Sequence, residues 1–270
     1  MHGFDWGPLL QGGPLFMGIL NITPDSFSDG GRFLEPSAAV AQARRLVEAG
    51  VGMLDLGAES TRPGAQEPSP EQEWARLEPV LAAIQKAHPG LPLSIDTRHA
   101  SVAAQSLAAG AAVVNDVTGF ADPAMLALAA KTDCGLVAMR SRLREGRLWM
   151  PPYEGAGPAD ASWAIAELGQ VKERLRDAGI RPQRILLDPG FGFGTTYTED
   201  LALWEALPGL PARLDWPADR FCIGVSRKRF VARRFAGDAS LPPAERDPAT
   251  AQAHAQAQAW GDRVFRTHAI

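Results

Sequence analysis

The chain has 270 residues, of which 46% are hydrophobic and 21% are charged, and its formal net charge is −4 at pH 7. This composition excludes a disordered chain and is sufficient for a full-sized hydrophobic core. The acidic balance gives no chain-wide positive field to hold a nucleic acid or an anionic membrane surface, so we expect chemistry on small molecules.

The cysteines and the N-terminus indicate the compartment. Cys134 and Cys222 lie far apart inside apolar runs and lack the spacing of metal ligands. We interpret them as buried free thiols in a reducing compartment. The N-terminus has no basic segment followed by a long apolar one, and no apolar run is long enough to cross a bilayer. We therefore predict a cytoplasmic protein without a membrane or nucleic acid partner.

A recurring unit organises the chain. An Ala/Leu-rich helical pattern ends at Gly and is followed by an apolar run that ends in a polar residue, as in LVEAGVGMLDLG. Gly after a helix, a short loop and a buried parallel strand account for this order. Eight apolar runs are predicted to be strands, at 15–21, 52–57, 92–96, 113–116, 135–139, 184–188, 221–226 and 264–268. Helical patterns lie between them, among them 36–50, 70–87, 100–110, 161–179 and 248–260.

Eight alternations of strand and helix in one domain, residues 1–270, favour an α/β fold. A single (β/α)8 TIM barrel fits better than a doubly wound sheet, which usually has fewer strands. The sequence ends just after the eighth strand, so the last helix is expected to be lacking or not shown. An uncovered apolar strand would expose its surface and its edge. We expect a neighbouring subunit or the Trp/Phe/Leu-containing N-terminus to cover this flank.

Polar residues stand at or just beyond the ends of the predicted strands. They are Asn21, Asp55, Asp96, Asn115 with Asp116, Asp188, Ser226 and His268. In a TIM barrel these ends and the loops after them form the face that carries active sites. One such residue is as often a helix cap as a ligand contact. Several carboxylates and carboxamides in one cavity need a cation or a ligand with many donors among them, so the set predicts a site.

Three segments add anion-binding character to this face. ESTRPG (59–64) follows the second strand, and FRTH (265–268) ends the eighth. Arg in each offers a planar fork of donors suited to phosphate or carboxylate. In GVSRKRF (224–230), Lys228 would have acidic partners, whereas Arg227 and Arg229 fit a solvated first turn of a helix.

DPGFGFG (188–194) is a Gly-rich turn that carries two aromatic residues. It is not a phosphate loop, because it lacks the GxxxxGK[ST] spacing. Two aromatic rings beside a polar pocket suit a flat, ring-shaped ligand. Packing beneath the loop is an equally good interpretation for Phe191 and a poorer one for Phe193.

Taken together, seven motifs resemble the dihydropteroate synthase family, a family of pterin-binding TIM barrels. They are MGILNITPDSFSDGG, DLGAESTRPG, SIDT, NDVTG, DPGFGFG, GVSRKRF and RTH, in the order of the family, and they cover the chain from about residue 15 to residue 268. The first two motifs are long and specific. The resemblance implies a transferase that condenses 6-hydroxymethyl-7,8-dihydropterin pyrophosphate with p-aminobenzoate, giving 7,8-dihydropteroate and pyrophosphate in folate biosynthesis. It also implies a homodimer and a target of sulfonamides.

The resemblance implies pterin-binding and metal-binding roles for six residues. Asp96, Asn115 and Asp188 would accept hydrogen bonds from the donor edge of the pterin. Lys228 would donate to the ring, and Met139 would pack on its face. Asn21 would contact Mg²⁺, the implied cofactor, which takes oxygen ligands and is usually shared with substrate phosphates.

Further residues match positions around the leaving group and the second substrate. Thr61, Arg62, Arg266 and His268 would hold the pyrophosphate or the second loop. Pro63 and Phe193 lie where p-aminobenzoate is distinguished from its mimics. Asn21, Lys228, Arg266 and His268 are the expected catalytic residues, and no nucleophilic side chain is required. The loop after Asn21 and the ESTRPG loop would close over the reacting centre.

The sequence departs from the family at several positions. Ala138 stands where many members carry His, Thr195 where Lys is usual, and Ala269 where Asp is common. The first departure is expected to alter the floor of the pterin pocket, and the second to remove a charge from its rim. Arg140, Arg142, Arg144 and Arg147 fit a solvated loop.

These departures leave two other functions open. One is a paralogue that binds pterin without condensing it, and the other is a corrinoid-linked methyltransferase domain with a similar pterin site. SRK (226–228) and RTH (266–268) favour the synthase, because methyl transfer has no pyrophosphate to hold.

Overall fold

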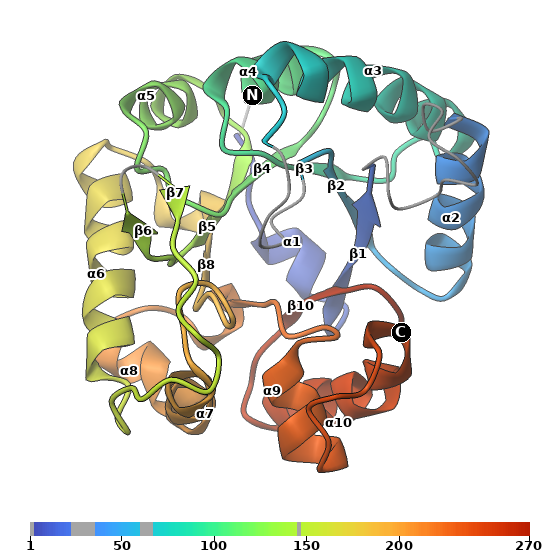
Figure 1. The fold of residues 1–270 in the computed structure, drawn as a ribbon. Helices are drawn as coiled ribbons and strands as arrows, with labels where there is room; N and C mark the ends of the chain where they lie inside the picture. The colour runs from blue at the N-terminus through green and yellow to red at the C-terminus, as the bar shows by residue number, and fades with distance from the viewer. Residues whose placement is uncertain (1–2, 23–35, 60–66, 145–146) are drawn as a thin grey trace.

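The computed structural model describes residues 3–22, 36–59, 67–144 and 147–270. Eight strands form one parallel sheet in the order β8-β5-β4-β3-β2-β1-β10-β9. A parallel bridge between Leu187 and Phe221 joins β8 to the segment before β9 and closes the sheet into a barrel (Figure 1). The predicted (β/α)8 TIM barrel is confirmed.

The barrel strands correspond to the eight predicted apolar runs. They are β1 (Leu15–Asn21), β2 (Met53–Gly57), β3 (Leu93–Asp96), β4 (Val113–Asp116), β5 (Gly135–Met139), β8 (Ile185–Asp188), β9 (Cys222–Ile223) and β10 (Val264–Thr267). A small antiparallel pair, β6 (Leu143–Arg144) and β7 (Arg147–Leu148), follows β5.

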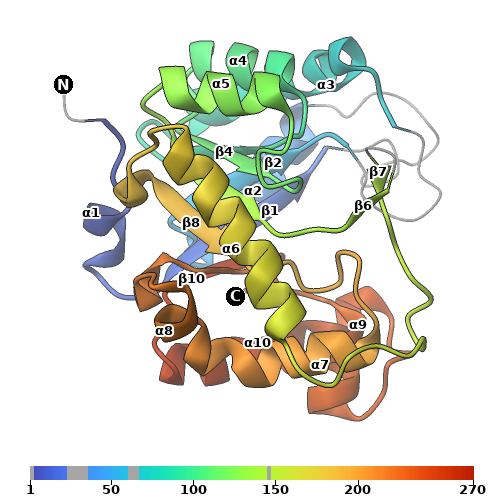
Figure 2. The same ribbon diagram turned by 90° about the vertical axis from the view of Figure 1, so that its left-hand side faces the viewer.

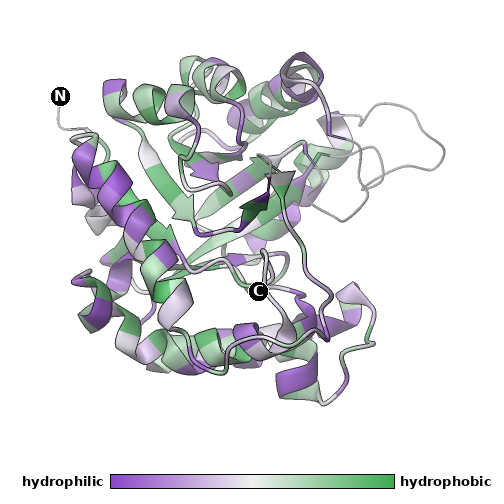
Figure 3. Ribbon diagram, turned by 60° about the vertical axis from the view of Figure 1, so that its left-hand side comes forward, coloured by the Kyte–Doolittle hydropathy of each residue, from purple (hydrophilic) through white to green (hydrophobic). Residues whose placement is uncertain are grey.

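Helices surround the barrel (Figure 1). They are α2 (Pro36–Glu48), α3 (Pro70–Ala87), α4 (Ala100–Ala108), α5 (Pro123–Lys131), α6 (Ser162–Asp177), α7 (Tyr197–Ala206), α8 (Leu210–Leu214), α9 (Arg229–Val231) and α10 (Asp247–Ala259). Figure 3 shows apolar segments in the central strands and polar segments on the surrounding helices. No helix in the described ranges is both long and apolar enough to traverse a bilayer.

Local sequence signals set the ends of several helices. α3 begins at a capping box, in which the Ser69 hydroxyl and the Gln72 side chain each bind the backbone N–H of the other residue. α7 begins with the same arrangement of Thr196 and Glu199. Gly50 follows α2 with a φ of 104°, a left-handed conformation that Gly adopts without the steric cost of a side chain.

The interior of the barrel determines which residues reach its mouth. Met53, Val113, Val137, Leu186 and Val264 belong to the apolar cluster inside the barrel. Side chains alternate between the two faces of a strand, so the residues two positions later also point inward. These residues, at the carboxyl ends of the strands, are Asp55, Asn115, Met139, Asp188 and Arg266.

The N-terminal helix α1 (Gly7–Leu10) closes the opposite end of the barrel. Trp6 and Leu10 join the interior cluster, and the Trp6 indole N–H donates to the Arg184 carbonyl at 2.9 Å. Figure 2 shows α1 and the β6–β7 pair at opposite ends of the molecule. The N-terminus therefore covers the floor of the barrel and not the flank of the eighth strand.

Within the chain, α10 packs on β10, so the covering by the N-terminus that the sequence predicts is wrong. The outward-facing Phe265 is fully buried, and its ring lies 4.9 Å from His254 of α10 and 5.6 Å from Phe16 of β1. The helix that follows β9 thus packs on the next strand of the barrel. Both cysteines are free and buried, as predicted.

We expect Trp6→Ala to lower the free energy of unfolding by about 3–5 kcal/mol, because it empties a buried site at the floor of the barrel. Gln11→Ala is the control, since Gln11 is an exposed neighbour and such changes stay within about 0.5 kcal/mol. Urea unfolding followed by circular dichroism measures both. If Trp6→Ala lowers the free energy of unfolding no more than Gln11→Ala does, Trp6 does not stabilise the floor of the barrel.

Candidate active site

Arg266 on β10 connects the polar residues at the mouth of the barrel. Its Nε donates to Asp55 Oδ2 at 2.5 Å, and its Nη2 donates to Asp96 Oδ2. Asn115 Nδ2 donates to the same Asp55 oxygen at 3.0 Å. Side chains from β2, β3, β4 and β10 therefore form one hydrogen-bonded network.

Burial and charge act in opposite directions in this network. Burial disfavours the charged form of Arg266, but the Asp55 and Asp96 carboxylates raise its pKa above the ordinary value, so the guanidinium stays charged. Burial raises the pKa of Asp96 to about 7, and the Arg266 guanidinium opposes this rise. The mouth therefore holds a fixed cation beside a carboxyl group that titrates near neutral pH.

Asp188 lies at the end of β8, beside the register partner Met139 of β5. Its Oδ1 accepts the Gly190 N–H at 2.7 Å. Burial raises the pKa of Asp188, and Lys228 opposes the rise. Asp188 thus orients the start of the DPGFGFG turn and presents a carboxylate inside the barrel.

Lys228 reaches this turn from the segment after β9. Its Nζ donates to the Phe191 carbonyl and lies 4.7 Å from the centroid of the Phe193 ring. Burial lowers the pKa of Lys228 to about 8, although Asp188 and Asp200 favour its charged form. Phe191 stacks on Phe230 at 5.2 Å in the core, so only Phe193 of the two aromatic residues lies at the site.

His268 lies beside Ser226 at the end of β10. Its Nδ1 is 3.0 Å from the Ser226 hydroxyl, and its backbone N–H donates to that hydroxyl oxygen at 3.1 Å. Burial, together with the positive charges of Arg227 and Arg266, lowers the pKa of His268 to about 3. His268 is therefore a neutral imidazole near neutral pH, able to exchange hydrogen bonds but without a charge.

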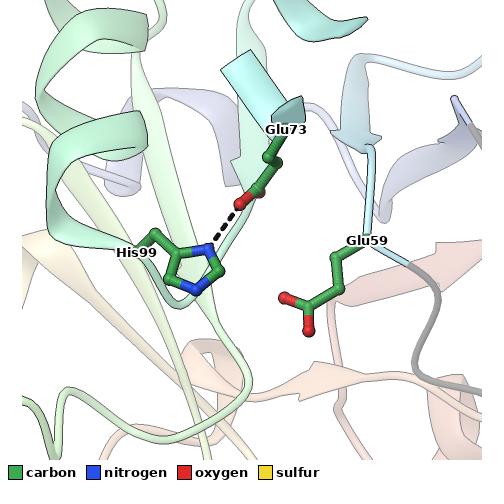
Figure 4. A group of neighbouring side chains, drawn as sticks. All are labelled: Glu59, Glu73 and His99. Atoms are coloured by element: carbon green, nitrogen blue, oxygen red, sulfur yellow. Dashed lines mark hydrogen bonds and ion pairs between the residues drawn. The ribbon is translucent and has the colours of Figure 1, made fainter. Parts of the chain in front are cut away.

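A second polar group lies between β2, α3 and α4 (Figure 4). Glu59, Glu73 and His99 hold potential metal-ligand atoms within 4.8 Å of one another. His99 Nδ1 is 2.6 Å from Glu73 Oε2, and both Glu59 oxygens accept hydrogen bonds from Arg98. The group is thus a possible acidic and His metal site whose side chains already pair with one another and with Arg98.

Oxygen donors suited to Mg²⁺ also occur inside the mouth. Asn21 ends β1, and alternation along this strand turns it inward like Met17. On the adjacent β2, Asp55 Oδ1 is buried and has no hydrogen-bond partner among the described residues. A carboxamide and an unpaired carboxylate oxygen fit the preference of Mg²⁺ for hard oxygen ligands.

Comparisons with known proteins identify the family. Residues 17–268 match the family model of the pterin binding enzymes. The dihydropteroate synthase of Mycobacterium leprae is 40% identical over 260 residues, which are 94% of this chain and 88% of the relative. The chain belongs to the family of pterin-binding enzymes.

Solved structures agree with this assignment. Dihydropteroate synthase of Xanthomonas albilineans with 4-aminobenzoic acid aligns with a TM-score of 0.81 and 36% identity, covering 94% of this chain and 87% of that one. The same enzyme in complex with 7,8-dihydropteroate gives a TM-score of 0.77 and 34% identity, with the same coverage. This member of the pterin-binding family is a transferase with dihydropteroate synthase activity, which releases pyrophosphate in folate synthesis. The predicted family and activity are confirmed.

The structure brings most of the predicted site residues of this pterin-binding enzyme to one end of the barrel. They are Asn21, Asp96, Asn115, Met139, Asp188, Phe193, Lys228, Arg266 and His268. Thr61, Arg62 and Pro63 lie outside the described residues, as does most of the loop after Asn21.

Expectations for Asp116 and Ala138 are wrong, and Thr195 has a contact that the sequence did not predict. Asp116 does not contribute to the mouth, because its carboxylate accepts hydrogen bonds from Thr118 and Phe120 in the following turn. Ala138 faces the outer apolar core and not the floor of the pocket. Thr195 is buried, and its hydroxyl donates to Asp200 at 2.7 Å, so it holds the DPGFGFG turn from behind.

Two arginines of the basic segment after β5, Arg140 and Arg142, differ from the solvated loop that the sequence predicts, whereas Arg144 is exposed. Arg140 is buried and binds backbone carbonyls of the DPGFGFG turn, and Arg142 donates to Gly194 and Glu199. Arg227 is paired with Asp247 at 2.7 Å, and Arg229 lies over the Tyr153 ring at 4.5 Å. Arg140, Arg142 and Arg227 are therefore held by protein groups, whereas Arg229 is exposed, as the sequence predicts.

The sequence placed Asp55 among the strand-end residues of the site but gave it no role, and it missed Asp200. In the structure, Asp55 connects Arg266 with Asn115. The alternation from Met53 to Asp55 was the available signal. Asp200 accepts the Gly192 N–H at 2.9 Å, and no sequence signal pointed to it, because it looks like an ordinary acidic residue in the first turn of α7.

We expect Asp55→Asn to lower the free energy of unfolding by about 1.5–3 kcal/mol, because it removes the charge of a fully buried carboxylate that binds Arg266, while Asp96 still pairs with Arg266. Asp247→Asn is the matched control: Arg227 and Asp247 are 28% and 32% exposed, against 18% and 0% for Arg266 and Asp55. That variant should lose about 1 kcal/mol or less. Urea unfolding of both variants measures the difference, and equal losses would contradict the burial argument.

Proposed function

We propose that the mouth of the barrel binds the dihydropterin ring through Asp96, Asn115 and Asp188. The single observation that carries this proposal is the convergence of these acceptors at one end of the barrel beside Lys228. The amino group and ring N–H of a pterin are donors that match carboxylate and carboxamide oxygens. Met139 is on the inner face of β5, where it would pack on the ring.

We further propose that Arg266 and His268 receive the departing pyrophosphate. Arg266 keeps its charge, and its Nη1 makes no hydrogen bond within the described ranges. His268 would contribute a hydrogen bond as a neutral imidazole. Thr61 and Arg62 are proposed to hold the same group, and Pro63 with Phe193 the p-aminobenzoate, on the basis of the sequence motifs.

In this mechanism the bond between the pterin methylene carbon and the pyrophosphate oxygen breaks first. The electron-rich pterin ring spreads the positive charge left on the methylene. The amine nitrogen of p-aminobenzoate then bonds to that carbon and loses a proton. The protein stabilises the leaving anion and positions the two reactants, which requires no nucleophilic side chain.

Asn21 and Asp55 are proposed to hold Mg²⁺, since both offer oxygen atoms inside the mouth. The ion would neutralise charge on the pyrophosphate oxygens. The Glu59, Glu73 and His99 group is a poorer candidate, because its carboxylates already pair with Arg98 and His99.

The oligomeric state, the domain content and the compartment of the enzyme are proposed from the sequence. The motif resemblance favours a homodimer, and residues 1–270 are proposed to form one domain. Two buried free cysteines suit a reducing compartment such as the cytoplasm.

The unmutated chain with Mg²⁺ and both substrates should form pyrophosphate and dihydropteroate in equal amounts. Lys228→Ala should reduce turnover by about a hundredfold or more, as removal of a well-placed charged donor does in other enzymes. Chromatography of dihydropteroate and a coupled pyrophosphate assay measure both products. A chain that binds pterin and forms neither product would be the catalytically silent paralogue.

We expect kcat/KM for the pterin pyrophosphate to fall as the pH rises through about 8. Burial lowers the pKa of Lys228 to about 8, so its ammonium is present below that pH and is lost above it. Lys228→Arg should remove this alkaline limb, because a guanidinium stays charged. Steady-state rates measured over a range of pH test this. If kcat/KM falls at the same pH in Lys228→Arg as in the unmutated chain, the fall belongs to another group.

A further inference from the structure

Arg140 is a guanidinium with almost no access to solvent. The residue is only 1% exposed, and it follows β5 on the outer side of the DPGFGFG turn. Its Nε donates to the Pro189 carbonyl at 2.8 Å, and its Nη2 donates to the carbonyls of Gly190 at 2.6 Å and Phe193 at 3.2 Å. Three carbonyls of one short turn therefore bind the same side chain.

Removing a guanidinium from water is unfavourable unless its donors are all used. Within the described part of the chain, the ion-pair partner of Arg140 is Glu167, at 3.2 Å, and this carboxylate is 33% exposed. The other hydrogen bonds of Arg140 go to the turn. The planar fork of Arg suits several fixed acceptors at once, so the turn and the side chain constrain each other.

Three other polar groups of the turn face the active site or α7. The Phe191 carbonyl accepts from Lys228, the Gly192 N–H donates to Asp200, and the Gly190 N–H donates to Asp188. With carbonyls 189, 190 and 193 bound to Arg140, the carbonyl of residue 191 points the other way, toward Lys228. Arg140 thereby determines which acceptor is offered to the ammonium.

The backbone path shows how closely the turn fits against Arg140. Gly190 has a φ of 72°, and a Cβ at this position would lie 1.8 Å from the Arg140 carbonyl oxygen. A displaced turn could not keep this contact and the three hydrogen bonds together. The turn has little room to take another conformation while Arg140 is in place.

We propose that Arg140 is a positioning residue for pterin binding, which fixes the turn at 189–193 so that the Phe191 carbonyl and the Phe193 ring hold Lys228 in the site. Arg140 itself does not touch the substrate. The inference rests on the proposed pterin site at Asp96, Asn115, Asp188 and Lys228.

Arg142 provides a matched control on the same segment. It also pairs with Glu167, at 3.3 Å, and lies over the Trp163 ring at 4.3 Å, as Arg140 does at 4.9 Å. Its carbonyl partner is Gly194, beyond the part of the turn that meets Lys228. A loss of stability alone should therefore affect both variants, whereas a loss of pterin positioning should affect only Arg140.

The experiment compares Arg140→Met with Arg142→Met. Isothermal titration with 6-hydroxymethylpterin should show affinity reduced by roughly tenfold or more in R140M, the effect of losing one or two hydrogen bonds to a charged group. R142M should bind within about twofold of the unmutated chain, a change below about 0.5 kcal/mol. The KM for p-aminobenzoate should stay nearly unchanged in both, and melting temperatures show whether each variant is folded.

Folded R140M with unchanged pterin affinity, or an equal loss in R142M, would overturn the positioning role. If R140M does not fold, Arg140→Gln, which keeps two N–H donors, replaces it with the same expected loss. Failure of both to fold would also overturn the inference, because Arg140 would then hold the barrel as a whole. An unmutated chain that binds no pterin would overturn the proposed pterin site and this inference with it, an outcome distinct from a failure confined to the variants.

Discussion

The mouth of the barrel depends on one partly buried cation, the guanidinium of Arg266. Asp55 and Asp96 both bind it, and Asn115 binds Asp55. Without a positive charge between them, these two neighbouring carboxylates would repel each other. Because Arg266 is present, acceptors from neighbouring strands can remain together, available to a ligand rich in donors. The proposed pterin site therefore depends on the charge that β10 brings to the mouth.

A second set of contacts supports the other half of the site. The turn after β8 is bound by Arg140 on its outer side, by Asp200 from α7 and by Lys228 from within the site. Lys228 is partly desolvated, which lowers its pKa, and its position depends on a backbone carbonyl and an aromatic ring. Precise placement of a few charges is how a reaction without a nucleophilic side chain is accelerated.

Stability and chemistry are separated along the barrel axis. At the N-terminal end, Trp6 and Leu10 complete an apolar interior formed by the first inward-facing residues of the strands. At the next inward-facing position, two residues further along, most of these strands carry polar residues. The outer faces pack against the helices, including α10, whose His254 covers Phe265 of the last strand. This arrangement lets the mouth accumulate unfavourable buried charges, since apolar packing elsewhere stabilises the fold.

The sequence alone determined the strand count, the barrel and most of the site. Apolar runs that end in Asp96, Asn115 and Asp188 are local signals, and so are a Gly after a helix or the motifs around Lys228 and Arg266. The sequence did not determine which partner each charged side chain binds. Arg140 looked solvated and is buried, Ala138 points outward, and Asp200 gave no signal at all. Such outcomes depend on contacts between residues far apart in the chain, and only the closed barrel brings those residues within hydrogen-bonding distance.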